Sequence, residues 1–167
     1  ETEPTLPSGS VGQYALMTMK SFGQKRALTE SSDSEVTMTF RTLINQVKAC
    51  AIGLLYCGVL AGDVILVVLP SIPHVPVIAL AVALIGGTFC PLSPKTLTNV
   101  SGVTGTKEII SRLQRDTNAT TLFTTTANLR AMPFLAKKFK LSVSMALSDE
   151  EQADEQEKAM KTTTSSK

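Results

Sequence analysis

One stretch of the chain has the composition of a phosphate-binding loop. Residues 101–107 read Ser-Gly-Val-Thr-Gly-Thr-Lys. Glycines let backbone N–H groups approach a phosphate closely, and a nearby lysine supplies positive charge. The residues that could take part are small, hydroxyl-bearing or basic: Ser101, Gly102, Thr104, Gly105 and Lys107. Such a short string has little specificity by itself, so its meaning depends on the elements around it.

The sequence contains few residues that could bind a metal ion or carry out nucleophilic catalysis. Apart from carboxylates, the possible metal ligands are three cysteines and one histidine: Cys50, Cys57, Cys90 and His74. A tetrahedral zinc site needs four such ligands, and these lie at unsuitable spacing without a Cys-x-x-Cys pair. His74 lies among prolines and apolar residues, where a loop or helix-cap role is more common than a catalytic base. We therefore predict no metal site and no catalytic residue.

Composition narrows the class of protein. The chain has 167 residues, of which 43% are hydrophobic and 18% charged, and this excludes a mostly disordered, core-poor protein. Sixteen basic and fourteen acidic residues leave a formal charge of +2, and the chain has no Trp and two Tyr. Neither a strong basic patch nor a base-stacking surface is indicated, so no nucleic-acid partner is expected.

A helix followed by a buried strand is the clearest pattern. Apolar residues recur at helical spacing from Phe40 to Leu55, with Thr39 placed to cap the start and Gly58 to end the helix. Gly62-Asp63 predicts a turn, in which Asp63 is structural and not catalytic. Six consecutive apolar residues at 64–69 predict a strand that is buried on both faces.

The stretch from Val64 to Pro94 contains no Asp, Glu, Lys or Arg, so it resembles a membrane span in composition. However, Pro70, Pro73 and Pro76 prevent a continuous helix. What remains is a helix at 75–85, about 15 Å long and roughly half the hydrocarbon thickness of a bilayer. We therefore expect no membrane span, and Gly86-Gly87 to lead into a short strand at 88–90.

The remaining elements complete an alternation of strands and helices. We predict an opening hairpin at 27–29 and 36–39, a helix at 107–116, a strand at 120–126, helical residues at 127–140 interrupted by Pro133, and a strand at 141–145. This order is typical of an α/β fold with a parallel sheet and right-handed βαβ crossovers.

An ordered series of short motifs resembles the N-terminal part of the adenylate-forming (AMP-binding) enzymes, which include acyl-CoA synthetases, 4-coumarate–CoA ligases and firefly-type luciferases. The resemblance covers about residues 10–147 and implies a truncated N-terminal portion of that family's three-layer α/β fold. It rests on five segments in the family's order: Ser21–Leu28, Thr39–Leu43, Ala51–Val64 with its Gly-Asp-Val ending, Leu69–Pro73, and Ala81–Pro94 with its Pro-Leu-Ser-Pro ending.

The resemblance also implies boundaries within the chain, and several residues of the chain differ from the family's pattern. It implies a lead-in at 1–20, an α/β subdomain at 21–147, and an acidic, then Thr/Ser-rich flexible tail at 148–167 that ends at a truncation point. Ser71 and Ser93 replace the usual asparagines, and His74 stands where an acidic residue is common. Residues 96–106 are expected to form an extra loop before the helix at 107.

The family's phosphate loop has the form S-(S/T)-G-T-T-G-x-P-K-G, and residues 101–107 match it only in part. They lack the Pro-Lys-Gly ending, and they follow Pro94 where the family has a loop that leads into a helix. We therefore predict that Ser101, Gly102, Thr104, Gly105 and Lys107 are a chance match and bind no nucleotide. The true loop is expected just beyond residue 167.

The resemblance implies an intact enzyme that activates a carboxylic acid with ATP and Mg²⁺ and transfers the acyl group to a thiol such as CoA. This chain would be scaffold only, inactive alone and without a bound cofactor. The chain begins with Glu1 and shows no signal-peptide pattern, so an intracellular site, cytoplasmic or peroxisomal, is expected. The alternative is a non-catalytic binding or membrane-associated protein that uses the apolar segment at 64–94.

Overall fold

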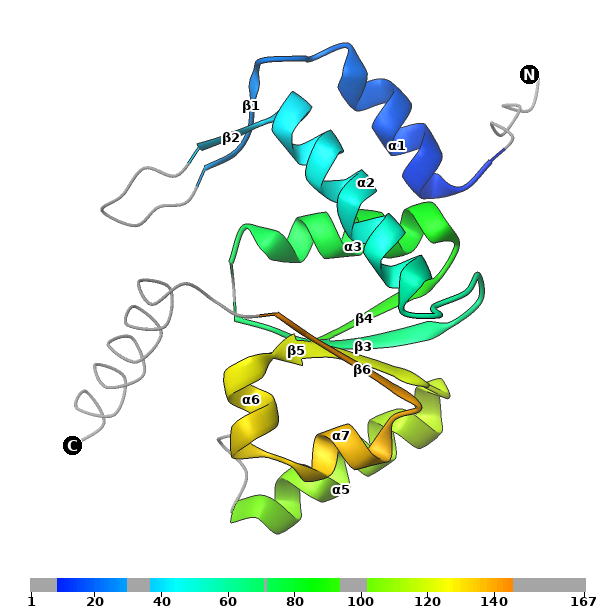
Figure 1. Cartoon of the computed structure of the whole chain (residues 1–167), viewed down its shortest axis with the longest axis vertical. Coiled ribbons are helices and arrows are strands. Elements are labelled where there is room, and N and C mark those ends of the chain that lie inside the picture. The colour runs from blue at the N-terminus through cyan, green and yellow to red at the C-terminus, as the bar shows by residue number, and fades with distance from the viewer. Residues whose placement is uncertain (1–8, 30–36, 71, 94–101, 146–167) are drawn as a thin grey trace, which may run out of the picture.

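A computed structural model describes residues 9–29, 37–70, 72–93 and 102–145. The described residues form three layers, with a central sheet between two groups of helices (Figure 1). The strands are β1 (Arg26–Thr29), β2 (Thr37–Thr39), β3 (Val64–Val68), β4 (Thr88–Leu92), β5 (Thr121–Thr125) and β6 (Leu141–Met145). The helices are α1 (Val11–Lys20), α2 (Phe40–Tyr56), α3 (His74–Ile85), α5 (Gly102–Thr117), α6 (Thr126–Ala131) and α7 (Phe134–Lys138).

The main sheet has four parallel strands in the order β4-β3-β5-β6, and β1 and β2 form a separate antiparallel pair. In the centre of the sheet, Leu66 of β3 pairs with Cys90 of β4 on one side and with Leu122 of β5 on the other. Helices α1, α2 and α3 lie on one side of the sheet, and α5, α6 and α7 lie on the other. The predicted α/β fold class is confirmed.

Strand β3 is buried on both faces, as its unbroken apolar run predicted. Ile65 and Val67 belong to the core cluster that packs against α2 and α3. Leu66 and Val68, which point to the opposite face, belong to the cluster that includes Ile110 of α5. Alternate side chains of a strand point to opposite faces, so both faces of β3 need apolar residues.

Helix α2 lies where the helical spacing of its apolar residues predicted it. The Thr39 hydroxyl accepts a hydrogen bond from the Thr42 N–H at 3.2 Å and caps the helix start. At the other end, Gly58 adopts a positive φ of 87°, which lets the Val59 N–H donate to the Leu54 carbonyl at 3.0 Å. The buried side chains follow one stripe: Leu43, Ile44, Val47, Ala51 and Leu54.

The uncharged segment after residue 64 divides at its prolines. Strand β3 ends before Pro70, and α3 begins after its N-cap, Pro73. Pro76 is tolerated because it lies in the first turn, where backbone N–H groups have no partner within the helix. Gly86, with a φ of 80°, ends α3. In the part of the chain that the structure describes, no helix has the length and apolarity needed to cross a bilayer.

Helix α1 lies within the predicted lead-in at 1–20, for which the sequence patterns predict no helix. Ser10 and Gln13 form a capping box, in which the Gln13 N–H donates to the Ser10 hydroxyl at 3.1 Å and the Ser10 N–H donates to the Gln13 side chain at 3.1 Å. Gly12 and Leu16 are the buried residues of this helix.

The expectation of an extra loop at 96–106 is wrong for its last five residues. Helix α5 begins at Gly102, and its residues Thr106 and Ile110, which lie one turn apart, are both buried. Residues 94–101 lie outside the described residues, as does the tail predicted at 148–167. The predicted break at Pro133 is confirmed, since it separates α6 from α7.

Candidate functional site

The order of the strands marks one position where a ligand site is expected. The chain passes from β3 outward to its neighbour β4 and then returns to β5 on the opposite side of β3. The segments that follow β3 and β5 therefore leave the sheet toward opposite faces, one to α3 and the other to α6 (Figure 1). In open parallel sheets, ligands bind outside the carboxyl ends of the strands at this reversal of strand order.

At this edge the described polar groups bind one another. The buried Thr124 hydroxyl donates to the Val68 carbonyl at 2.9 Å, and the Asn128 amide nitrogen donates to the Thr124 hydroxyl at 3.1 Å and to the Val68 carbonyl at 3.5 Å. The Thr125 hydroxyl accepts from the Asn128 N–H at 3.1 Å and caps α6. These bonds fix β3, β5 and α6 relative to one another, so the network positions the scaffold.

The string at 101–107 is helical from its second residue. Gly102, Thr104, Gly105 and Lys107 lie in the first turns of α5, and Ser101 lies outside the described residues. The Lys107 ammonium lies 5.5 Å from the centroid of the Phe134 ring in α7, a cation–π distance. The structure thus places the lysine of this string against an aromatic ring.

The possible metal ligands are distributed over several elements. Cys50 lies in α2, Cys57 at its C-cap, Cys90 in β4 and His74 at the start of α3. The described residues contain no group of three or more His, Cys, Asp or Glu side chains that could hold a metal ion. Asp63 accepts a hydrogen bond from the Leu60 N–H at 2.8 Å, so it is a turn residue, as predicted.

The cysteines of α2 differ in their surroundings, which gives a testable difference in reactivity. Cys50 is half-buried, and burial raises its pKa above the ordinary thiol value, whereas Cys57 is exposed. The thiolate is the reactive form. We expect iodoacetamide to label Cys57 faster than Cys50 at pH 8 in the folded chain, and the Cys50 rate to keep rising at higher pH. Peptide mass spectrometry measures both rates.

The unfolded chain is the control, because in urea the two cysteines should react at similar rates. Cys50 reacting as fast as Cys57 in the folded chain would contradict its burial. Because burial raises the pKa of Cys50 only in the folded chain, the Cys50 thiol loses its proton at a lower pH in the unfolded chain. Folding stability should therefore fall as the pH rises from the ordinary thiol pKa toward the pKa of Cys50 in the folded chain.

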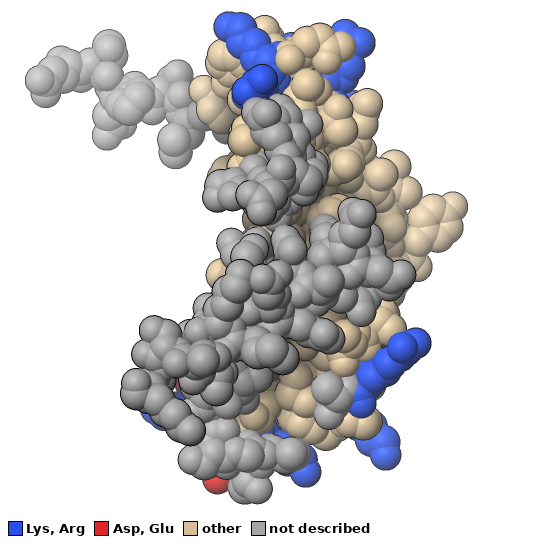
Figure 2. Space-filling view, turned by 90° about the vertical axis from the view of Figure 1, so that its left-hand side faces the viewer, with Lys and Arg blue, Asp and Glu red and all other residues tan. Residues whose placement is uncertain are grey.

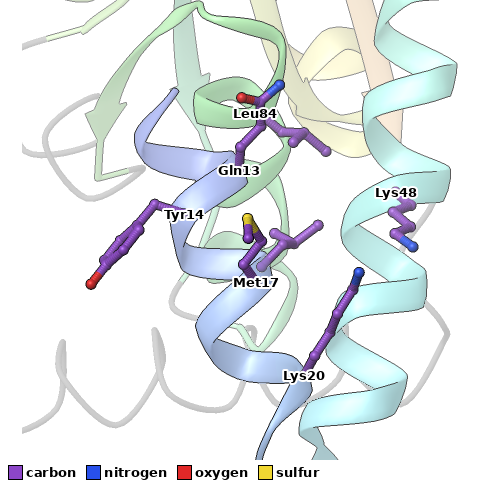
Figure 3. A pocket seen from close by; sticks show the side chains of 7 residues that line it. Gln13, Tyr14, Met17, Lys20, Lys48 and Leu84 are labelled. Carbon is purple, nitrogen blue, oxygen red and sulfur yellow. The ribbon is translucent and has the colours of Figure 1, made fainter. Parts of the chain in front are cut away.

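A separate groove lies between α1, α2 and α3 (Figure 3). Its volume is about 540 Å³, within the range of small-molecule sites. Apolar side chains dominate its lining, and two lysines approach it from different helices. The lining residues are Gln13, Tyr14, Leu16, Met17, Lys20, Lys48 and Leu84. No sequence pattern predicted this groove, because most of its lining comes from the unpredicted helix α1.

Comparisons with known proteins agree on the family. The model of the AMP-binding enzyme family matches residues 17–167. A comparison with curated protein sequences found no match. Among solved structures, VinN has a TM-score of 0.65 at 18% identity, and a fatty acyl CoA synthetase of Mycobacterium tuberculosis has 0.65 at 15%. The N-terminal subdomain of NpsA of Klebsiella oxytoca, in complex with 3-hydroxyanthranilyl-AMSN, has 0.57 at 20%.

These structures are considerably longer than this chain. The alignments cover 83%, 81% and 70% of this chain but 34%, 26% and 27% of VinN, the synthetase and the NpsA subdomain. The chain thus spans about a quarter to a third of each, and the likeness extends to the parallel sheet. Because the family model matches most of the residues, the chain belongs to the AMP-binding enzyme family.

Proposed function

We propose that this chain is the N-terminal scaffold part of an ATP-dependent acid–thiol ligase. Such an enzyme adenylates a carboxylic acid and then passes the acyl group to CoA to form a thioester. The family match over residues 17–167 carries the proposal. The four-stranded parallel sheet supports it, because it corresponds to the N-terminal part of the adenylate-forming fold. We infer an intracellular setting, in the cytoplasm or in peroxisomes.

The described residues do not fit a nucleotide, so we propose that the chain alone is inactive. Catalysis of adenylation depends on positioned charge around the phosphates and on orientation of the attacking acid. In this chain, residues 102–107 are helical and the Lys107 ammonium lies over Phe134. At the edge of the sheet, Thr124 and Asn128 bond to Val68 and to each other. ATP, Mg²⁺ and CoA would be held elsewhere in the intact enzyme.

ATP–pyrophosphate exchange tests the proposal. We expect no exchange by the 167-residue chain with a panel of aliphatic and aromatic carboxylic acids, with or without Mg²⁺. The product of the complete reading frame should exchange pyrophosphate with at least one acid of the panel and form its CoA thioester. The Lys107→Gln variant of this product should retain its activity, because we assign no phosphate contact to Lys107.

Two outcomes would contradict the proposal in different ways. Exchange by the 167-residue chain itself would show that it contains a working nucleotide site, and loss of that exchange in Lys107→Gln would locate the site at residues 101–107. A reading frame whose product exchanges pyrophosphate with no acid and forms no thioester would count against the ligase function.

A further inference from the structure

The groove between α1, α2 and α3 combines an apolar interior with positive charge at one end. Leu16 of α1 and Leu84 of α3 contribute its apolar surface, and Met17 extends that surface at the rim, where its side chain is 70% exposed. Lys20 of α1 and Lys48 of α2 also line the groove. Figure 3 shows the Lys20 side chain reaching from α1 toward α2, and the Lys48 side chain lying on α2.

No described carboxylate neutralises these lysines. The acidic residues that the structure describes are Asp63, Glu108 and Asp116, and none of them lines the groove. Figure 2 shows Lys and Arg side chains gathered at the end of the molecule that carries the end of α1 and the start of α2. Two lysines that line one recess from neighbouring helices attract an anion to it, and this attraction weakens as salt is added.

We propose that this groove binds a free amphiphilic organic anion, with its acidic head between Lys20 and Lys48 and its apolar chain along Leu16, Met17 and Leu84. The groove follows α1 from Gln13 to Lys20, eight residues whose seven helical rises span about 10 Å, so a medium-length acyl chain fits it. Lysine presents a point charge and lacks the planar geometry of arginine, so these lysines recognise the head group by its negative charge.

The proposal is independent of the ligase function. The groove is formed by helices on one side of the sheet, and α1 packs against α2 and α3. The polar network at the carboxyl edge involves β3, β5 and α6 and shares no residue with the groove. Loss of groove binding would therefore leave the proposed reaction unaffected, and an inactive enzyme would leave the groove intact.

Titration calorimetry on the full 167-residue chain tests the proposal, with decanoate as the probe below its micelle-forming concentration. We expect saturable binding that weakens with added salt, and much weaker binding of decanol and of acetate, which lack the charge and the chain respectively. In methionine-methyl NMR spectra, decanoate should shift the Met17 resonance at the same concentrations.

The Lys20→Gln/Lys48→Gln variant should bind decanoate about tenfold more weakly, a loss of about 1.4 kcal/mol. The matched control is Lys137→Gln/Lys140→Gln, which removes the same charge from exposed lysines near the start of β6 and should bind within about twofold of the unmodified chain.

Three results would overturn the proposal: equal affinity for decanol and decanoate, unchanged affinity in the Lys20/Lys48 variant, or no saturable binding of decanoate. Binding to vesicles of phosphatidylglycerol without binding of decanoate would also overturn it, because it would show that the lysines and exposed apolar residues meet a lipid surface.

Discussion

Replacing Leu54 with alanine is expected to lower the free energy of unfolding by about 2–5 kcal/mol. Leu54 is 2% exposed and lies in the core cluster that joins α2 to β3 and α3. Removing its side chain leaves a cavity, and the surrounding helices and strand can close it only in part. Urea unfolding followed by circular dichroism measures the change.

The next residue provides a matched control. Leu55 lies in the same helix but is 51% exposed, so Leu55→Ala should change the free energy of unfolding by about 0.5 kcal/mol or less. The two variants remove the same atoms and differ only in burial. If both variants lose a similar amount of stability, the orientation of α2 on the sheet is wrong.

Replacing Gly12 with alanine is expected to cost about 1–3 kcal/mol and to displace α1. Gly12 lies directly against α3, and an added Cβ would be 2.6 Å from the Ala83 carbonyl carbon and 2.5 Å from the Leu84 Cα. These neighbours are backbone atoms, so a side-chain rotation cannot relieve the contact. Hydrogen exchange should show lost protection along α1, with little change in β3 and β5.

Gly53→Ala is the matched control, because Gly53 also lies inside a helix but has no neighbour within 4 Å of an added Cβ. Alanine favours a helix over glycine by about 0.8–1.0 kcal/mol, so this variant should be more stable than the unmodified chain. The same substitution should thus have opposite signs at the two positions. Stabilisation by Gly12→Ala would contradict the close packing of α1 on α3.

Sequence patterns predicted the middle of the fold because each element there has a distinct pattern of apolar residues. The apolar spacing from Phe40 to Leu55 follows a helix, and the unbroken run at 64–69 follows a doubly buried strand. The prolines at 70 and 73 separate strand from helix for steric reasons that need no tertiary information.

Helix α1 could not be predicted from the sequence, because its buried side is small and its exposed side is apolar. It buries Gly12 and Leu16, whereas Val11, Tyr14 and Met17 are largely exposed. Its apolar residues therefore do not mark a buried stripe, and its position depends on the approach of Gly12 to the backbone of α3. Such a contact between two helices leaves no periodic signal in one sequence.

The polar network at the carboxyl edge could not be predicted either. The threonines at 120–126 indicated a strand by their β propensity alone. The bond from Thr124 to Val68 joins residues 56 positions apart, so it depends on β5 lying beside β3 in the sheet. The position of this edge follows from strand order, which is a property of the whole fold.

The pairing of β3 with β4 and β5 decides whether the fold is right, because the family fold and the proposed scaffold role both require it. Nuclear Overhauser measurements on the labelled chain should show parallel contacts from the backbone around Leu66 to that around Cys90 on one side and Leu122 on the other. Continuous helical contacts from residue 64 through Pro70 and Pro73, without these cross-strand contacts, would contradict the sheet and with it the proposed function.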